Sequence, residues 1–396
     1  NTLVEISDYL YKKNPEGANE IINKLESKYR QHIDELFATP EYKQKGLELI
    51  KSHFDYIRSY TKDLFTLFEE KVVLAQGELI STAMMNYYLQ ECGVKSVLLP
   101  ALEYMRTDKN AEPDPVYIKD KLQVQLELHP DAEIYITQGY ICRNAYGEID
   151  NLQRGGSDYT ASLIGAAINA SEIQIWTDID GMHNNDPRIV DKTAPVRHLH
   201  FEEAAELAYF GAKILHPTCV QPAKYANIPV RLLNTMEPTA PGTLISNDTE
   251  KGKIKAVAAK DNITAIKIKS GRMLLAYGFL RKVFEIFESY QTSIDMICTS
   301  EVGVSVSIDN TKHLNEILDD LKKYGTVTVD HDMCIICVVG DLEWENVGFE
   351  AKALDAMRDI PVRMISFGGS NYNISFLIRK EDKNKALQSL SDHLFN

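Results

Sequence analysis

The strongest constraint on the fold is a regular alternation of β-type and helical segments between residues 72 and 246. Short runs rich in Val and Ile are separated by stretches with helical spacing; the runs are 95–99, 133–137, 172–177 and 229–233. Strands that alternate with helices in this way form mainly parallel sheets covered by helices on both faces. The sequence therefore predicts an α/β domain that binds its ligands at the carboxyl ends of the strands.

A different pattern precedes this alternation. Apolar residues fall at helical spacing from 16 to 70, with a break at Thr39-Pro40, which predicts a helical hairpin or bundle. After the alternation, the polar and turn-rich stretch 237–253 is typical of a domain boundary. We therefore expect residues 1–250 to form one domain.

The rest of the chain is a tandem repeat of one small α+β unit. The order strand, helix, strand, strand, helix, strand is predicted for 262–331 and recurs, without its last strand, in 332–396. Ser305 and Ser375 hold corresponding positions in the two copies. The linker 251–261 contains an isolated β-type run that could supply the missing strand, so we expect the linker to be coupled mechanically to both repeats.

Composition excludes several classes of protein. The 43 basic and 57 acidic residues give a net charge of −14, which argues against nucleic acid as a partner. The longest apolar runs are far below the ~20 residues needed to cross a bilayer, so no membrane partner is expected. Six cysteines in 396 residues are too few for a disulfide scaffold and favour a reducing, cytoplasmic location. Cys334 and Cys337 face opposite sides of a β-type run, so they predict no metal site.

The string Arg154-Gly155-Gly156-Ser157-Asp158 directly precedes a helix that we expect to begin near residue 159. Two glycines let a backbone approach a ligand closely, Ser and Asp are common N-cap residues, and a helix N-terminus favours anions. An acidic residue here would also suit a ligand ammonium group. Taken alone, the string is equally compatible with a capped tight turn.

Three more signals carry charged groups, and the first of them lies in a loop at the expected carboxyl edge of the sheet. Thr177 and Asp178 end a predicted strand and are followed in the next loop by Arg188. Lys213 lies in a turn between two helices, where its point charge could meet a phosphate. Glu78 is expected in the first turn of a helix, where a lone Glu is most often a partner of the helix dipole. Each signal alone is more often structural than functional.

Together, however, these strings resemble those of the aspartate kinases, members of the amino acid kinase family. The matching strings extend over essentially the whole chain and are 76–79, 105–108, 137–140, 154–160, 176–178, 186–188, 210–217 and 240–243. In this family the tandem units are ACT domains, and the resemblance continues there through 278–280 and 295–301. It implies an amino acid kinase fold in 1–250, a linker strand in 251–261, and ACT domains of ferredoxin-like α+β type in 262–331 and 332–396.

The resemblance also implies an activity: ATP-dependent phosphorylation of the L-aspartate β-carboxylate to 4-phospho-L-aspartate, the first step of lysine, threonine and methionine biosynthesis. The β-carboxylate is already ionised at neutral pH and needs no general base, so the protein has to position two anions and neutralise charge. ATP is then a substrate, Mg²⁺ is bound mainly through the nucleotide, and no separate metal site is expected.

The functional positions of the family carry over to matching residues of this chain. The positions that match aspartate-binding residues are Glu78, Arg154, Gly155, Gly156, Ser157 and Asp158. Those that match ATP-binding residues are Thr177, Asp178, His183, Arg188 and Lys213, and the two implied catalytic residues are Lys213 and Asp158. His183 stands where many relatives have Tyr, and Gln153 stands where Gly is common. The implied effector-binding residues are Met273, Gly278, Phe279, Leu280, Asp295, Thr299, Ser300 and Glu301.

In the family the effector binds where ACT domains pair, which implies a homodimer, with a tetramer as the alternative. A helix start and exposed amides suit a carboxylate, and Asp295 and Glu301 suit amino groups, so a dibasic amino acid fits best. Lysine is the first choice of effector and threonine the second.

Two alternative functions stay open. One is another enzyme of the amino acid kinase family, acting on glutamate, acetylglutamate or a nucleotide; the other is a non-catalytic amino-acid sensor. The family begins with the string Lys-Phe-Gly-Gly-Thr-Ser, whose lysine and amides hold the ATP phosphates, and this string does not occur in the 396 residues. We expect either an upstream segment that carries it or a damaged catalyst. Without a dehydrogenase-like extension, the expectation is a monofunctional kinase.

Overall fold

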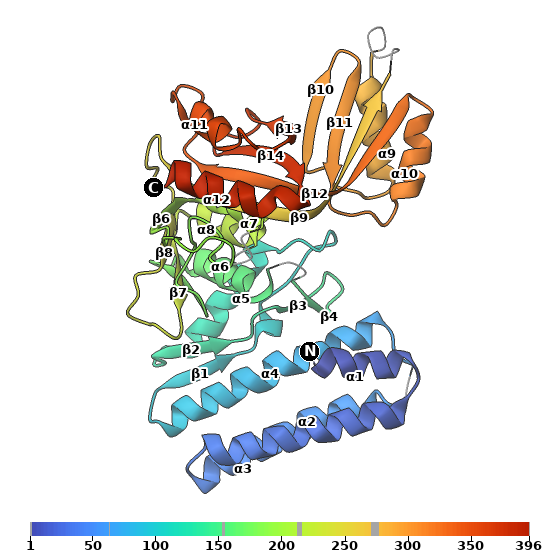
Figure 1. The fold of residues 1–396 in the computed structure, drawn as a ribbon. Coiled ribbons are helices and arrows are strands. Elements are labelled where there is room, and N and C mark those ends of the chain that lie inside the picture. The colour runs from blue at the N-terminus through green and yellow to red at the C-terminus, as the bar shows by residue number, and fades with distance from the viewer. Residues whose placement is uncertain (1, 63, 153–154, 212–215, 271–276, 396) are drawn as a thin grey trace. The chain divides into compact units, whose positions relative to one another are not determined.

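The computed structural model describes residues 2–62, 64–152, 155–211, 216–270 and 277–395 (Figure 1). The chain divides into two compact units. Unit 1 comprises Asn1–Ile173 and Thr218–Ile228, and unit 2 comprises Gln174–Pro217 and Pro229–Asn396.

Unit 1 begins with four helices: α1 (Thr2–Tyr11), α2 (Pro15–Leu36), α3 (Pro40–Ser59) and α4 (Leu67–Glu91). Proline opens α2 and α3, where its fixed φ suits the first turn and its missing N–H costs no hydrogen bond. Ile22, Ile33 and Phe54 lie in the shared core of these helices. The predicted helical bundle is confirmed, with its break at Thr39-Pro40.

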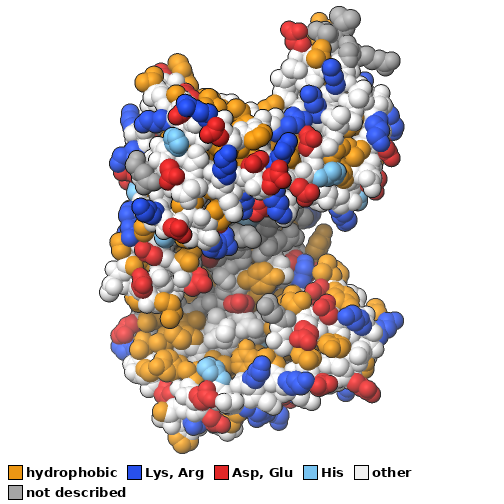
Figure 2. Space-filling model, viewed as in Figure 1, with side chains coloured by type: hydrophobic (Ala, Val, Ile, Leu, Met, Phe, Trp, Pro, Cys, Tyr) orange, Lys and Arg blue, Asp and Glu red, His pale blue; other side chains and the backbone are white. Residues whose placement is uncertain are grey.

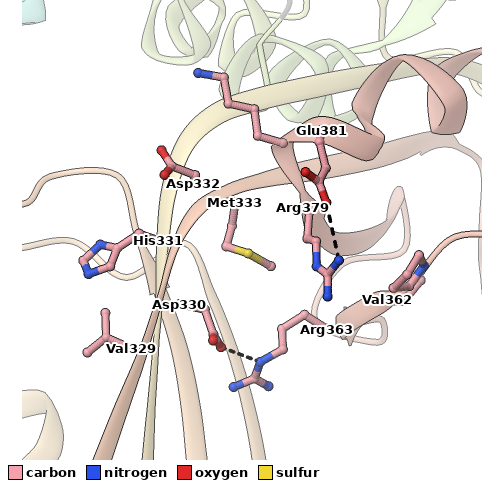
Figure 3. A pocket seen from close by; sticks show the side chains of 11 residues that line it. Val329, Asp330, His331, Asp332, Met333, Val362, Arg363, Arg379 and Glu381 are labelled. Carbon is pink, nitrogen blue, oxygen red and sulfur yellow. Dashed lines mark hydrogen bonds and ion pairs between the residues drawn. The ribbon is translucent and has the colours of Figure 1, made fainter.

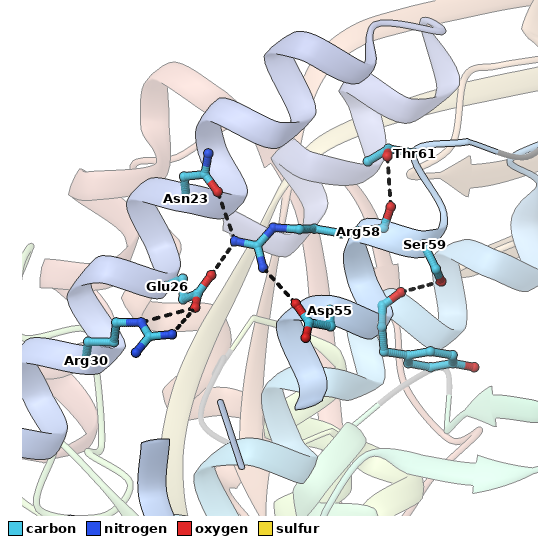
Figure 4. A network of polar contacts seen from close by, with 8 residues as sticks. Asn23, Glu26, Arg30, Asp55, Arg58, Ser59 and Thr61 are labelled. Atoms are coloured by element: carbon cyan, nitrogen blue, oxygen red, sulfur yellow. Dashed lines mark hydrogen bonds and ion pairs between the residues drawn. The ribbon is translucent and has the colours of Figure 1, made fainter. Parts of the chain in front are cut away.

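A charge network holds α2 against α3 (Figure 4). The Glu26 side chain, only 11% exposed, accepts a hydrogen bond from Arg30 at 2.7 Å and forms an ion pair with Arg58 of α3. Arg58 also donates to Asn23 at 2.9 Å and to Asp55 at 3.3 Å. Burial alone would raise the pKa of Glu26, but the hydrogen bonds from Arg58 and Arg30 outweigh it and lower that pKa.

The α/β part of unit 1 follows α4. Its first sheet pairs β1 (Ser96–Leu99) in parallel with β2 (Ile134–Thr137), connected through η1 (Ala101–Glu103) and α5 (Pro115–Glu127). An antiparallel pair, β3 (Ile141–Arg143) and β4 (Ile149–Asn151), leads to α6 (Gly156–Ile168), which contacts α8 (Gln221–Tyr225). The core of this part includes Tyr104, Leu122 and Leu163.

Unit 2 contains a four-stranded sheet with the order β5-β7-β8-β6. Its strands are β5 (Ile173–Thr177), β6 (His198–His200), β7 (Val230–Asn234) and β8 (Thr243–Ser246). β6 pairs with β8 in parallel, whereas β7 and β8 are antiparallel because a turn-rich connection links them directly. Helix α7 (Phe201–Tyr209) follows β6, and η2 (Pro217–Val220) precedes α8.

The remainder of unit 2 is one antiparallel sheet with the order β10-β11-β9-β12-β14-β13. The long strands β9 (Ile254–Lys269) and β12 (Thr326–Gly340) lie at its centre. The first repeat adds α9 (Phe279–Ser289), β10 (Met296–Ser300), β11 (Gly303–Ile308) and α10 (Leu314–Lys322). The second adds α11 (Phe349–Ala356), β13 (Val362–Ser366), β14 (Asn373–Arg379), η4 (Lys380–Asp382) and α12 (Lys383–Leu394).

The linker run supplies the strand that the second repeat lacks. Val257 of β9 lies opposite Val338 of β12, while Ile266 lies opposite Val329 in the first repeat. The sequence predicted four separate strands here, but each pair is continuous and bends where one residue adopts a positive φ. The two bending residues are Asn262 (φ 61°) and Asp332 (φ 53°), types that tolerate this conformation.

Charged side chains of both signs lie intermixed on the face drawn in Figure 2. Within the described part of the chain, every helix is too short or too polar to cross a membrane.

We expect Arg58→Ala to lower the free energy of unfolding by about 1 to 2 kcal/mol, because the mostly buried Glu26 carboxylate loses a charged partner. The lowered pKa means that this contribution is full above the ordinary glutamate pKa of 4.5 and is lost as the pH falls through the lower folded-state pKa. Urea unfolding at pH 7 and at pH 4 measures both effects.

Lys24→Ala is the matched control, since Lys24 pairs with Glu20 on the same helix but both side chains are mostly exposed. Because solvent screens an exposed ion pair, this substitution should change stability much less than Arg58→Ala. Equal effects of the two substitutions at pH 7 would contradict a structural role for the Glu26 network.

Candidate functional site

The string expected to bind aspartate lies at the start of α6. The helix begins at Gly156, with Gly155 as its N-cap in the left-handed conformation (φ 75°). The expectation of a start near Tyr159, with Ser157 and Asp158 as caps, is wrong because the left-handed glycine ends the preceding turn sooner. Both residues lie in the first helical turn instead. Gln153 and Arg154 lie outside the described residues.

The first turn of α6 packs closely on the loop after β2. The backbone N–H of Tyr140 donates to Thr160 Oγ1 at 3.0 Å, and that hydroxyl donates to the Gly156 carbonyl at 3.2 Å. A Cβ on Gly139 would lie 2.5 Å from Ser157 Oγ, so this approach requires glycine. The loop after β2 thereby sets the position of the helix N-terminus.

Glu78 lies in the middle of α4 rather than in a first helical turn. The expected position is wrong because Thr66 and Glu69 form a capping box that starts the helix further upstream. Gln138, in the loop after β2, donates to Thr82 Oγ1 at 2.9 Å, and Thr82 donates to the Glu78 carbonyl at 2.7 Å. The same loop that positions α6 is therefore also bonded to α4.

Glu78 and Asp158 are half-buried carboxylates in unit 1. Burial raises the pKa of both. Among the described residues, neither carboxylate accepts a hydrogen bond or forms an ion pair. A cationic ligand group would compensate these charges, which is the chemistry required to bind an ammonium group.

In unit 2, Thr177 ends β5 and begins a tight turn. Its hydroxyl accepts a hydrogen bond from the backbone N–H of Ile179 at 3.1 Å, and its carbonyl accepts one from Thr235 at 2.8 Å. Asp178, between Thr177 and Ile179, is exposed. Gly181 has a φ of 76° and a Cβ there would overlap Thr243, so the turn requires glycine at this point.

Arg188 is held by its neighbour Asp186. The guanidinium Nε and Nη2 donate to the two carboxylate oxygens at 2.9 and 2.7 Å, and this contact lowers the pKa of Asp186. The Arg188 side chain is 83% exposed, so replacing this pair by an anionic ligand costs little. His183 Nδ1 lies 3.0 Å from Thr193 Oγ1. Lys213 lies outside the described residues.

The loop after β5 packs against the second α+β repeat. The Asn184 carbonyl accepts a hydrogen bond from Val257 of β9 at 2.8 Å. The side chain of Asn185 donates to the Leu387 carbonyl of α12 at 2.9 Å, and Val190 is buried in the core of that repeat. The candidate nucleotide-binding loop and the second repeat therefore share one packed core.

The expected effector residues begin at the start of α9. Gly278 is the N-cap of this helix, with a φ of 85°, and Phe279 and Leu280 are its first residues. Phe279 is buried in the core of the first repeat, whereas Leu280 is 38% exposed. Met273 lies outside the described residues.

The other expected effector residues lie at opposite ends of β10. Asp295 directly precedes the strand, and its buried carboxylate is paired with Lys260 at 2.7 Å. Thr299, Ser300 and Glu301 lie at the far end and are exposed. At ~3.3 Å per residue, Asp295 and Thr299 are about 13 Å apart. A single copy of the first repeat therefore does not bring the described members of the set together.

A pocket of about 790 Å³ lies beside the bend of β12 in unit 2 (Figure 3). Arg363 reaches Asp330 at 2.8 Å, and Arg379 reaches Glu381 at 3.4 Å. None of the described effector residues lines this pocket.

Known proteins match both parts of the chain. The model of the amino acid kinase family matches residues 17–234, and that of an ACT domain matches residues 336–394. The lysine-sensitive aspartokinase 3 of Escherichia coli (strain K12) is 34% identical over 335 residues, which cover 82% of this chain and 75% of the relative. The chain belongs to the aspartokinases of the amino acid kinase family.

A second aspartokinase, the chloroplastic aspartokinase 1 of Arabidopsis thaliana, is 35% identical over 349 residues, covering 83% of this chain and 61% of the relative. The chain thus spans 61% and 75% of the lengths of these two aspartokinases. The crystal structure of E. coli aspartokinase III with aspartate and ADP (R-state) has a TM-score of 0.82, 29% identity, and covers 99% of this chain and 91% of that chain. Its complex with lysine and aspartate (T-state) has a TM-score of 0.78, 30% identity and the same coverage.

The aspartokinase family and fold expected from the sequence are confirmed, while the roles of individual residues stay predictions. Sequence reasoning assigned no role to Gly139 or Thr160, although both lie within matching strings. Their importance comes from contacts between loops that are far apart in the chain. The only sign of this contact in the sequence is that Gly139 lies close to the end of a predicted strand, where glycine often marks a close approach of two backbones.

Gly139→Ala should destabilise unit 1 by about 1 to 3 kcal/mol, because the added methyl group overlaps Ser157 and forces α6 away from the loop. Gly369→Ala is the control, since a Cβ there meets no atom within 4 Å and its φ is not in the positive range. Thermal unfolding of the two variants tests this; an equal or smaller loss in Gly139→Ala would show that the close approach is not required.

Proposed function

We propose that this aspartokinase chain carries out ATP-dependent phosphorylation of L-aspartate to 4-phospho-L-aspartate. The observation that carries the proposal is the pair of half-buried carboxylates, Glu78 and Asp158, which no described residue compensates. Asp158 lies in the first turn of α6, where free backbone N–H groups attract anions. The region thus offers complementary groups for the ammonium and the carboxylates of an amino acid.

In this proposal the substrate is held by its ammonium group and its α-carboxylate. Glu78 and Asp158 bind the ammonium group, and Arg154 forms a bidentate contact with the α-carboxylate. The backbone of Gly155, Gly156 and Ser157 contributes N–H groups at the start of α6. This leaves the β-carboxylate of aspartate free to react.

The reaction needs no proton transfer from the protein. A β-carboxylate oxygen forms a bond to the γ-phosphorus of ATP while the bond from that phosphorus to the ADP oxygen breaks, and ADP leaves with the electron pair. Because the nucleophile is already ionised, rate enhancement comes from alignment and charge neutralisation. Lys213 is proposed to supply part of that neutralisation.

The nucleotide is proposed to bind through the residues around the end of β5. Thr177, Asp178 and His183 lie along the loop, and the exposed Arg188 side chain would exchange its partner Asp186 for a phosphate. Mg²⁺ prefers oxygen ligands, keeps several waters and is held mainly by nucleotide phosphates. The exposed carboxylate of Asp178 fits the water shell of such an ion.

We also propose that lysine, or as second choice threonine, regulates the enzyme through the first ACT domain. The candidate residues at the two ends of β10 are too far apart to surround one amino acid within a single copy. Pairing of ACT domains from two copies would bring opposite ends together, which supports a homodimer, with a tetramer as the alternative. The complex of E. coli aspartokinase III with lysine and aspartate supports lysine as the effector. The six cysteines are free thiols, which supports a reducing cytoplasmic location.

We expect Glu78→Gln and Asp158→Asn each to lower kcat/KM for aspartate by about tenfold or more, the loss expected when a charge-assisted hydrogen bond of about 1.5 to 3 kcal/mol is removed. The KM for ATP should change less. Only the ionised carboxylates bind ammonium, and burial raises the pKa of both groups. As the pH is lowered, wild-type kcat/KM for aspartate should therefore begin to fall at a pH above the ordinary pKa values of Asp and Glu.

Coupled measurement of ADP release over a pH series tests these expectations. Asp131→Asn removes one exposed negative charge elsewhere in unit 1 and should leave kcat/KM unchanged. Wild-type values in both site variants would refute the aspartate-binding assignment.

Lysine titration tests the regulatory part of the proposal. We expect Asp295→Asn to raise the half-inhibiting lysine concentration by about tenfold, because the ligand loses a charged partner. Asp320→Asn, in the same ACT domain, removes a carboxylate that faces Tyr290 and should leave inhibition unaltered. Inhibition by threonine but not by lysine would reverse the order of the two effectors.

A further inference from the structure

Tyr209, Lys260 and Asp295 form a cluster around one buried carboxylate in unit 2. Asp295 Oδ1 accepts hydrogen bonds from the Tyr209 hydroxyl at 2.8 Å and from Lys260 Nζ at 2.7 Å. The Lys260 ammonium also lies 4.4 Å from the centre of the Tyr209 ring and 2.9 Å from Asp309. The Asp295 side chain is only 1% exposed, whereas the Tyr209 residue is 43% exposed.

The three residues come from three separate elements. Tyr209 is the last residue of α7, in the kinase part of the chain. Lys260 lies on β9 next to the bend between the two ACT repeats, and Asp295 directly precedes β10 of the first repeat. A single carboxylate therefore joins the end of α7 to the first ACT domain.

The backbone two residues after Tyr209 lies directly against β9. Gly211 has a φ of 120°, and a Cβ there would overlap the carbonyl oxygen of Ala259, the residue before Lys260. A shift of β9 beside Lys260 therefore displaces the backbone at Gly211. In sequence, this glycine leads directly into the segment that carries the candidate nucleotide-binding Lys213.

The charge of Asp295 is incompletely satisfied. Its second oxygen, Oδ2, is buried and has no hydrogen-bond partner among the described residues. Burial raises the pKa of Asp295 although Lys260 opposes the shift, and burial together with Asp295 raises the pKa of Tyr209 to about 12. A ligand ammonium at this carboxylate would compete with Lys260, which carries the same chemical group.

We propose that Tyr209 is a positioning residue that transmits effector binding to the kinase part of the chain. A primary ammonium group that binds Asp295 displaces Lys260 and the Tyr209 hydroxyl, and this releases the end of α7 from the first ACT domain. The inference rests on the proposed effector site at Asp295. It adds an internal competitor, Lys260, and a connecting residue, Tyr209.

Tyr209→Phe tests the connection in the full-length chain, because it removes the hydroxyl but keeps the ring that faces Lys260. Tyr290→Phe is the matched control, since the Tyr290 hydroxyl donates to Asp320 at 2.9 Å within the same ACT domain. Lysine binding is measured by titration calorimetry, and inhibition is measured by the rate of aspartate-dependent ADP release.

Tyr209→Phe should bind lysine as tightly as wild type or up to about fivefold more tightly, because a competing hydrogen bond to Asp295 is gone. Its maximum inhibition should fall to less than half of the wild-type value, while Tyr290→Phe behaves as wild type. Lys260→Gln is the second variant: it removes the competing ammonium and should tighten lysine binding by at least about fivefold. Thermal unfolding verifies that each variant is folded.

Full inhibition of Tyr209→Phe by lysine would overturn the connection while leaving the proposed effector site intact. Loss of lysine binding in a folded Tyr209→Phe would make Tyr209 a ligand contact and would also overturn it. Unchanged or weaker binding in Lys260→Gln would refute the displacement. If neither lysine nor threonine binds or inhibits the wild type, the proposed effector site fails and the connection fails with it.

Discussion

The backbone pairing of β9 with β12 is the constraint on which the regulatory part of the molecule depends. One end of β9 completes the second ACT repeat and the other end completes the first, so the same strand contributes Val257 to one core and Ile266 to the other. A flexible linker would absorb a change in either repeat, whereas a continuous hydrogen-bonded strand passes it on. The backbone N–H of Val257 also donates to the Asn184 carbonyl, so the candidate nucleotide-binding loop is hydrogen-bonded to the same strand.

Two ion pairs in this unit illustrate how burial decides the consequence of ligand binding. Arg188 is exposed, so its ion pair with Asp186 is screened by solvent and can be opened by a phosphate with little effect on the fold. Asp295 and Lys260 form a largely buried pair, and separating such charges without a substitute is costly. A ligand that replaces Lys260 must therefore bring its own positive charge, and it changes which protein groups are held together.

Long periodic segments of this fold could be predicted from the sequence, because a buried helix face or strand leaves its period in the chain. The first residues of the helices were harder to predict from the sequence. The start of α6 depends on Gly155 adopting a positive φ, and the position of Glu78 within α4 depends on a capping box well upstream. The contacts that shape the candidate sites could not be predicted. Tyr209 and Asp295 are 86 residues apart in the sequence. The periodicity of a segment indicates which face of the helix or strand is buried, but not which distant residue that face contacts.

The size of the interaction around Asp295 fits the task of a regulatory connection. A hydrogen bond to a charged group contributes about 1.5 to 3 kcal/mol, and a ligand shifts a conformational equilibrium only by the difference in its free energy of binding to the two states. Allosteric coupling energies are typically about 1 to 3 kcal/mol, so one such bond is of the same size as a typical coupling energy. A cluster of many buried bonds would hold α7 too firmly for a single amino acid to release it, and a fully exposed pair would hold it too weakly to report binding.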